Sequence, residues 1–326
     1  MKILISGITG FAGSHLADFL LESVPEAEII GLYRWRSRRE NILQLEGRVT
    51  LAECDIRDAT ATREVIEEQR PDFIFHLAAQ SFVPTSWKAP QESLSTNILG
   101  QLNIFEAVRK ADLDCRIQVA GSSEEYGMVR PEEIPINEDQ PLRPLSPYAV
   151  SKVAQDALAY QYFMSFGLKT IRTRGFNHTG PRRPSVFVCS DFARQVVEIE
   201  KGLRPPVIRV GNLEARRDFT DVRDTVQGYW LALSKGEPGQ VYNVATGTSW
   251  AISEVLDKLV ELAGVEIRIE EDPARLRPSD VPRLEGDATR LRKATGWRPT
   301  IPFEKTLADL LDYWRERLTE SRSEFP

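Results

Sequence analysis

The sequence predicts an α/β protein with a Rossmann-type, doubly wound parallel sheet and a smaller C-terminal α/β substrate lobe. Two observations predict it: short apolar segments alternate with amphipathic helical patterns, and the first strand runs directly into a glycine-rich turn. Strand, helix and strand in this rhythm require right-handed crossovers, which build a parallel sheet. The predicted strands of the first half cover residues 3–6, 27–33, 49–52, 73–77, 116–120 and 169–174.

The first strand ends in three glycines, and a helical pattern follows over residues 12–21. One glycine permits a sharp turn, one lets the backbone approach a pyrophosphate, and one lets helix and strand pack closely. The phosphates then meet the free N–H groups at the helix N-terminus. A loop that needs positive φ at three places would explain the glycines alone. The dinucleotide contacts predicted here are Gly7, Gly10, Phe11, Ala12 and Gly13.

The segment after the second predicted strand indicates which dinucleotide binds. It contains four arginines, Arg34 and Arg36 first among them, and no acid before Glu40. A carboxylate here would hold the ribose 2′-hydroxyl of NAD, whereas a guanidinium accommodates the 2′-phosphate of NADP. The segment therefore favours NADP over NAD, with a solvated basic loop as the alternative. Further cofactor contacts are expected after the third and fourth strands, at Asp55, Ile56, Leu77, Ala78 and Ala79.

Composition excludes several classes of protein. The 326 residues carry a net charge of −6, with a pI near 5.4, so the charge balance does not indicate a nucleic-acid partner. No stretch approaches the roughly 18 apolar residues of a membrane span, and no signal peptide is evident, so a cytoplasmic location is expected. The cysteines Cys54, Cys115 and Cys189 are isolated, which favours small buried hydrophobes over disulfides or a metal site.

The chain divides into two predicted parts. Residues 1–176 form the NADP-binding Rossmann domain, to which segments of the C-terminal half return, and residues 177–326 form mainly the substrate-binding lobe. Short strands are expected in this second part at 206–210, 240–244 and 266–269, and a helix from 303 to about 318 ends the chain.

Four residues suggest hydride-transfer chemistry. Tyr148 and Lys152 are four residues apart, so a helix places both on one face. A phenol with a pKa near 10 is a poor base at neutral pH, and a neighbouring ammonium stabilises the phenolate. The fifth strand ends in a segment that brings Ser122 and Glu124 to the same cleft, whereas a structural role is expected for Glu125.

With these motifs, the chain resembles the extended short-chain dehydrogenases that modify nucleotide sugars. It is most similar to the branch that contains GDP-mannose 4,6-dehydratase and GDP-4-keto-6-deoxymannose reductase. The resemblance implies that Tyr148 takes the proton of the sugar C4 hydroxyl, Lys152 holds the cofactor ribose, and Ser122 hydrogen-bonds the C4 oxygen. Glu124 would then remove the C5 proton and help water leave C6, or only order its loop.

The resemblance also implies a GDP-sugar substrate and a homodimer or homotetramer, the dimer formed through helices at 90–110 and 148–166. Apolar residues there fit either an interface or plain core. His178 is interpreted as structural. Segments 34–42, 76–81 and 176–183 resemble the dehydratases, whereas Ser190 and Asp191 stand where the dehydratases have a basic pair, as in the reductases. The dehydratase is favoured, with the reductase as the alternative. A 4-epimerase and a non-catalytic NADP(H) sensor are the remaining alternatives. The substrate contacts expected are Ser81, Ser123, Asn177, Val188, Arg194, Arg217 and Arg277.

Overall fold

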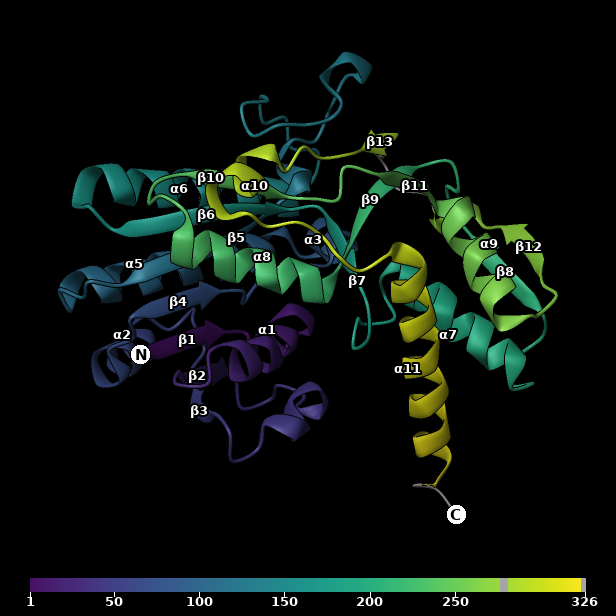
Figure 1. Ribbon diagram of the computed structural model, residues 1–326, viewed down its shortest axis with the longest axis horizontal. Coiled ribbons are helices and arrows are strands. Elements are labelled where there is room, and N and C mark those ends of the chain that lie inside the picture. Colours follow the sequence, from purple (N-terminus) through teal and green to yellow (C-terminus); the bar gives the residue numbers. More distant parts are fainter. Residues whose placement is uncertain (276–280, 324–326) are drawn as a thin grey trace.

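The computed structural model describes residues 1–275 and 281–323, and a seven-stranded parallel sheet forms its centre (Figure 1). The strand order is β10-β6-β5-β4-β1-β2-β3, so the order reverses beside β1, where parallel sheets of this type bind ligands. Every strand predicted in the first half is confirmed, with ends shifted by a residue or two. The strands are β1 (Lys2–Ser6), β2 (Glu28–Tyr33), β3 (Thr50–Glu53), β4 (Phe73–His76), β5 (Arg116–Ser122), β6 (Lys169–Gly175) and β10 (Val241–Val244).

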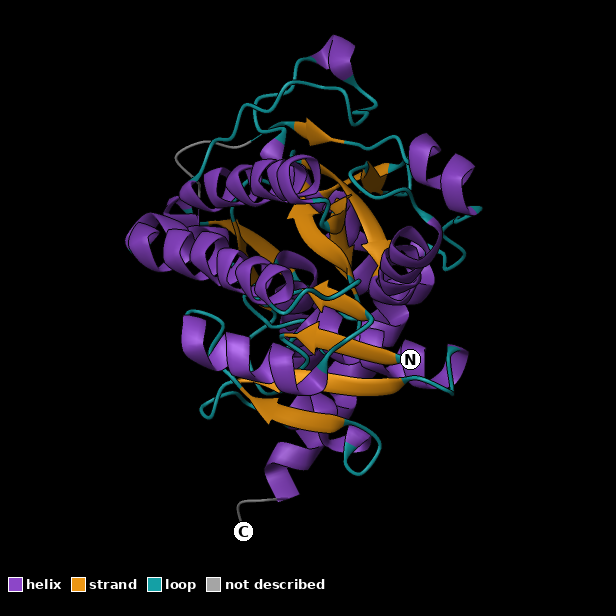
Figure 2. Cartoon of the chain, turned by 90° about the vertical axis from the view of Figure 1, so that its left-hand side faces the viewer, coloured by secondary structure: helices purple, strands orange, loops and turns teal. Residues whose placement is uncertain are grey.

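Helices cover both faces of this sheet (Figure 2). One apolar core joins β1 to α1 (Phe11–Ser23) and α8 (Val222–Lys235). A second core, on the other face, packs α2 (Ala59–Gln69), α5 (Gly100–Lys110) and α6 (Pro147–Phe166). The helix expected over 90–110 forms as α4 (Pro90–Leu94), one π-helical turn at Ser95–Leu99, and α5. Two short helices complete this part, α3 (Val83–Lys88) and α10 (Thr289–Thr295).

A smaller lobe with its own core lies beside the large sheet, on the right in Figure 1. One of its sheets pairs β9 with three short strands, and the second pairs only two strands. Phe219 and Phe303 stack in its core with ring centroids 5.3 Å apart. Its strands are β7 (Asn177–Thr179), β8 (Val207–Val210), β9 (Arg216–Asp221), β11 (Ser249–Ala251), β12 (Arg268–Glu271) and β13 (Arg283–Leu284), and its helices are α7 (Val188–Glu200), α9 (Ile252–Ala263) and α11 (Phe303–Ser323).

One strand prediction needs correction. The sequence predicts the strand at 240–244 as part of the smaller lobe, but β10 extends the large sheet by pairing with β6. All four of its residues are buried, and Trp297 packs into the same core. The indole Nε1 of Trp297 donates a hydrogen bond to the Asp224 carbonyl, 2.9 Å away, on α8. Segments of the C-terminal half thus complete the nucleotide-binding sheet.

The cysteines of this chain are all buried. Cys54, Cys115 and Cys189 are buried and unpaired, as predicted for small hydrophobic residues. Burial raises the pKa of all three thiols. Across residues 1–275 and 281–323, no helix is long and apolar enough to cross a membrane, and no cluster of three or more His, Cys, Asp or Glu side chains could hold a metal ion.

Candidate active site

The glycine turn between β1 and α1 has the geometry that a bound dinucleotide needs. Gly7 has a φ of 76°, and a Cβ on it would lie 2.9 Å from the backbone of Ala78. Gly10 is the N-cap of α1, where no side chain caps the helix and no acid occupies the first turn. The N–H groups of this turn therefore have no side-chain acceptor, and a pyrophosphate fits there. This cradle supports the predicted cofactor site.

A cavity of about 1110 Å³ lies at the carboxyl edge of the large sheet and extends to the smaller lobe. Most of the residues predicted from sequence line it. The predicted cofactor residues in its wall are Gly7, Gly10, Phe11, Ala12, Gly13, Arg34, Asp55, Ile56, Leu77, Ala78 and Ala79. The predicted catalytic and substrate residues in its wall are Ser81, Ser122, Ser123, Glu124, Tyr148, Lys152, Asn177, Val188 and Arg217.

Tyr148 and Lys152 reach the cavity from the first two turns of α6. The helix begins there because the Ser146 hydroxyl caps it, accepting a hydrogen bond from the Ala149 N–H at 3.0 Å. Lys152 Nζ lies 5.8 Å from the Tyr148 ring centroid and donates to the Ala120 carbonyl at 2.8 Å. Both side chains are more than nine-tenths buried. The helix thus presents a phenol and an ammonium together, as the four-residue spacing predicts.

Burial changes the proton affinities of this pair. It raises the pKa of Tyr148 above the ordinary value of 10.0, while hydrogen bonding with Ser122 lowers it. It lowers the pKa of Lys152 from 10.5 to about 8, against the opposing effect of the Glu125 charge. The phenol alone is therefore a weaker acid than in water, and it needs positive charge beside it to act as a base near neutral pH.

The end of β5 supplies the hydroxyl and the carboxylate. Ser122 caps the short 3₁₀ turn Ser123–Glu125, and its Oγ accepts from the Glu124 N–H at 3.2 Å. The Glu124 side chain lines the cavity, and its carboxylate has no hydrogen-bond or ion-pair partner among the described residues. Glu125, in contrast, is fully buried and accepts from the Ser122 N–H at 2.7 Å. The expected structural role of Glu125 fits this placement.

The arginines after β2 are not equivalent. Arg34 lines the cavity, whereas Arg36 lies outside the lining and its guanidinium is 4.3 Å from the Trp35 ring centroid. Asp55 also lines the cavity, and its carboxylate pairs with Arg57 at 2.6 Å. Hydrogen bonding from Arg57 is the largest cause of a lowered Asp55 pKa. Of the two predicted arginines, only Arg34 reaches the cavity.

Two predicted substrate residues do not reach the cavity wall. Arg194 pairs with Glu198 at 2.6 Å and Asp191 at 3.1 Å along α7, and it is absent from the lining. The prediction for Arg194 therefore lacks support in this geometry, because its own helix provides both partners. Arg277 lies outside the described residues. The neighbouring Arg275 does line the cavity and pairs with Asp191 at 3.3 Å.

Arg183 and its aromatic neighbours contribute more than the sequence indicated. The guanidinium lies 3.6 Å from the Phe187 ring centroid and 4.8 Å from that of Phe11, and it lines the cavity. Burial lowers the Arg183 pKa to about 10. His178 stacks on Phe11 with centroids 5.8 Å apart, and burial lowers its pKa to about 4. A neutral, packed imidazole fits the structural role expected for His178.

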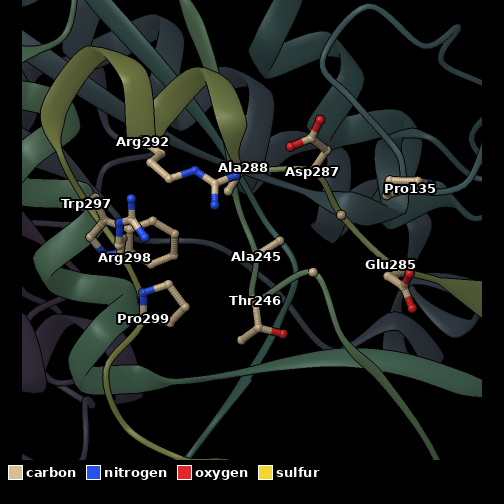
Figure 3. Close-up of a pocket in the computed structure, with 12 residues that line it drawn as sticks. Pro135, Ala245, Thr246, Glu285, Asp287, Ala288, Arg292, Trp297, Arg298 and Pro299 are labelled. Atoms are coloured by element: carbon tan, nitrogen blue, oxygen red, sulfur yellow. The ribbon is translucent and has the colours of Figure 1, made fainter.

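A second, smaller hollow of about 230 Å³ lies away from these residues (Figure 3). It is formed where Trp297 and Arg298, after α10, face the β10–β11 connection at Thr246. Glu285 and Asp287 line its other side. None of the predicted catalytic or binding residues belongs to this hollow.

The fold and the grouped residues define an enzyme of the extended short-chain dehydrogenase class, whose Rossmann lobe carries a pyridine nucleotide. A family model described as GDP-mannose 4,6 dehydratase matches residues 4–310. The chain belongs to this family.

Proteins similar to this chain include both a reductase and a dehydratase. The chain is 33% identical over 320 residues to GDP-6-deoxy-D-mannose reductase of Pseudomonas aeruginosa, covering 98% of this chain and 99% of that protein. It is 34% identical over 325 residues to GDP-mannose 4,6 dehydratase 1 of Arabidopsis thaliana, covering 95% and 88%. Among solved structures, RMD from Pseudomonas aeruginosa complexed with NADPH matches with a TM-score of 0.85 at 31% identity, covering 97% of this chain and 99% of that one.

Proposed function

We propose that this protein is a GDP-mannose 4,6-dehydratase that uses NADP. The observation that carries this proposal is the Glu124 carboxylate, which faces the cavity beside Ser122, Tyr148 and Lys152 and has no partner among the described residues. A dehydratase needs a base beside the proton-transfer pair, because water leaves C6 only after the C5 proton is removed. A carboxylate that is held by no cation is available for that step.

Each catalytic residue has one task in this scheme. Tyr148 takes the proton of the C4 hydroxyl, the Lys152 ammonium stabilises the phenolate, and Ser122 hydrogen-bonds the C4 oxygen. Glu124 removes the C5 proton, made acidic by the C4 ketone, and protonates the departing C6 hydroxyl. When bound, the dinucleotide would supply the acceptor for the C4 hydride and the donor that returns it to C6. C5 regains a proton from solvent as the hydride reaches C6, and Tyr148 releases to solvent the proton that it took from the C4 hydroxyl, so protons balance over the cycle. The net products are GDP-4-keto-6-deoxymannose and water.

The proposal includes the residues that bind the two ligands. Arg34 would take the 2′-phosphate of NADP, since no acid stands between it and Glu40. The glycine cradle, together with Asp55, Ile56, Leu77, Ala78 and Ala79 in the cavity wall, would hold the rest of the dinucleotide. Asn177, Val188 and Arg217 would contact the GDP-sugar, in a substrate lobe drawn mainly from residues 177–326, while residues 1–176 bind mainly the cofactor.

A reductase is the second candidate, and Asp191 favours it. This acidic residue lines the cavity at a position where the dehydratases are expected to have a positively charged residue. Its carboxylate pairs with Arg194 and Arg275. A reductase would use the same Ser122, Tyr148 and Lys152 to deliver a proton to the C4 oxygen. It would not require Glu124 to remove a proton from carbon.

The experiment that separates the two uses the purified protein and two substrates. Incubation with GDP-mannose, without added NADPH, should yield a 4-keto-6-deoxy sugar by mass spectrometry. Glu124→Gln should abolish this product, while Glu132→Gln, a change at an exposed acid, should leave it intact. Unchanged GDP-mannose together with NADPH oxidation on the 4-keto sugar would assign the reductase instead. Interconversion of C4 epimers, insensitive to Glu124→Gln, would assign an epimerase.

We also propose that the protein self-associates in the cytoplasm. Several apolar side chains on or next to α5 and α6 are about half exposed, and they would become buried between two copies of the chain. Free, buried thiols suit a reducing compartment. Light scattering after size-exclusion chromatography tests the assembly, and a monomeric mass would exclude it. The exposed apolar residues are Leu99, Val150, Tyr160, Met164 and Phe166.

A further inference from the structure

A buried charge cluster lies behind the catalytic residues and takes no part in the scheme above. It consists of Glu125 after β5, Asp156 on α6 and Arg174 on β6, which are 0%, 5% and 5% exposed. None of the three lines the cavity, so none is expected to touch substrate or dinucleotide. Burying three ionisable groups costs free energy unless they are well paired, and burial raises the pKa of Glu125 from 4.5 to about 8, so the cluster invites a functional explanation.

Arg174 is the centre of the cluster. Its Nε lies 3.0 Å from Asp156 Oδ2 and 3.2 Å from Glu125 Oε2. Its Nη1 donates to the Tyr126 hydroxyl and to the Glu138 carbonyl, both at 3.1 Å. A rigid, planar guanidinium with several fixed partners holds the two carboxylates in set positions.

Each carboxylate connects Arg174 to one half of the catalytic set. On one side, Glu125 Oε1 accepts from the Ser122 N–H at 2.7 Å. On the other, Asp156 lies four residues after Lys152 and eight after Tyr148, and therefore on the same face of α6. The strand end that carries the hydroxyl and the helix that carries the phenol and ammonium are thus joined through one buried guanidinium.

Gly121 shows how closely this arrangement is packed. A Cβ at this position would overlap Glu125 Oε1 and lie 2.9 Å from the Thr173 carbonyl. Only a residue without a side chain leaves room for the Glu125 carboxylate to reach back to the Ser122 N–H. Glycine at position 121 is therefore required for the hydrogen bond between the Glu125 carboxylate and the Ser122 N–H.

We propose that Glu125 is a positioning residue: it fixes the Ser122 hydroxyl relative to Tyr148 and Lys152 through the Ser122 N–H on one side and the Arg174–Asp156 pair on the other. This inference rests on the proposed function only in that Ser122 acts at the sugar oxygen. That role is common to dehydratase, reductase and epimerase. The Glu125 charge also raises the pKa of Lys152 and so favours the ammonium form beside Tyr148.

The test compares Glu125→Leu with Glu125→Gln. Leucine removes the acceptor for the Ser122 N–H, whereas glutamine keeps an oxygen acceptor but places an amide beside Arg174. We expect leucine to lower kcat by about ten- to a hundredfold, because a misplaced hydrogen-bond partner weakens transition-state stabilisation. KM and the dissociation constant of NADP(H) should stay within about twofold, since Glu125 touches neither ligand. Glutamine should lower the melting temperature yet keep kcat within about threefold of wild type.

A double-variant cycle shows whether Glu125 acts through Ser122. In the Ser122→Ala background, adding Glu125→Leu should lower kcat no further, because the residue that it positions is gone. Independent, multiplying losses would overturn the inference, as would equal kcat values for the leucine and glutamine variants. The cycle is measured with whichever of the three sugar reactions the wild type performs, so a wrong substrate assignment does not affect it.

A crystal structure of Glu125→Leu supplies a readout that needs no activity. The Ser122 Oγ should move away from the Tyr148 hydroxyl, while the cavity wall around Arg34 and Asn177 stays in place. If Glu125→Leu does not fold, Gly121→Ala displaces the same carboxylate and takes its place in both measurements. An unmoved Ser122 hydroxyl would overturn the inference.

Discussion

Acidification should destabilise this protein through His76, at the end of β4. The imidazole is 2% exposed, its Nδ1 lies 2.9 Å from Ser6 Oγ, and its Nε2 lies 3.3 Å from the Gln155 amide nitrogen. Burial, followed by the nearby Lys152 charge, lowers the His76 pKa from 6.5 to about 3. The folded protein therefore keeps this imidazole neutral at pH values where the unfolded chain binds a proton.

The size of the effect follows from that difference in pKa. Between about pH 6.5 and pH 3 the unfolded state binds more protons, so stability falls as the pH falls through this window. At about pH 5, one and a half units below the unfolded pKa, His76 should lower the free energy of unfolding by about 2 kcal/mol relative to pH 7.5. A loss of this size is a large fraction of a typical folding free energy.

Urea unfolding at the two pH values measures this loss, with His76→Asn as the comparison. Asparagine cannot titrate, and its amide can take the place of Nδ1 beside Ser6. Wild type should lose about 2 kcal/mol more than the variant between about pH 7.5 and pH 5. The other two histidines are present in both proteins, so their contributions cancel. Equal losses in the two proteins would refute the reasoning.

Three further predictions concern two residues of the site and the contact between α8 and residues 300–301. Tyr148→Phe should lower kcat at least about a hundredfold without weakening dinucleotide binding, because only the proton-transfer group is lost; steady-state turnover and a binding titration check this, and unchanged turnover would contradict it. Arg34→Ser should weaken NADP binding about tenfold and leave NAD binding unchanged, because it removes one charge-assisted contact at an exposed position. Calorimetric titration measures both affinities. Equal weakening of NADP and NAD binding would exclude the 2′-phosphate contact. Asp224→Ala should lower the free energy of unfolding, measured with urea, by about 2–4 kcal/mol. The N–H groups of Thr300 and Ile301 lie 2.9 and 2.8 Å from the Asp224 carboxylate and would lose their acceptor. An unchanged urea midpoint would contradict this prediction.

Local patterns in the sequence are enough to predict six of the seven strands of the large sheet and most of the residues that line the cavity. The glycine turn, the capped start of α6 and the Tyr148–Lys152 spacing each depend on residues close together in the chain. The place of β10 could not be predicted, because a four-residue apolar run does not say which distant strand it pairs with. Arg194 pairs with Asp191 and Glu198, three and four residues away on its own helix, and this helical spacing is visible in the sequence. The position of Arg183 depends on two aromatic rings, and only the folded structure brings both to it.

The pairing of β10 with β6 affects how the chain can fold during synthesis. The outer edge of β6 stays unpaired until Val241–Val244 are synthesised, some seventy residues later. At a ribosomal rate of about 5–20 residues per second, this interval lasts several seconds. Until then, a row of backbone donors and acceptors is open to pairing with other nascent chains. A fragment cut at the apparent lobe boundary would keep that open edge permanently. We therefore expect it to aggregate rather than to survive as an independent nucleotide-binding module.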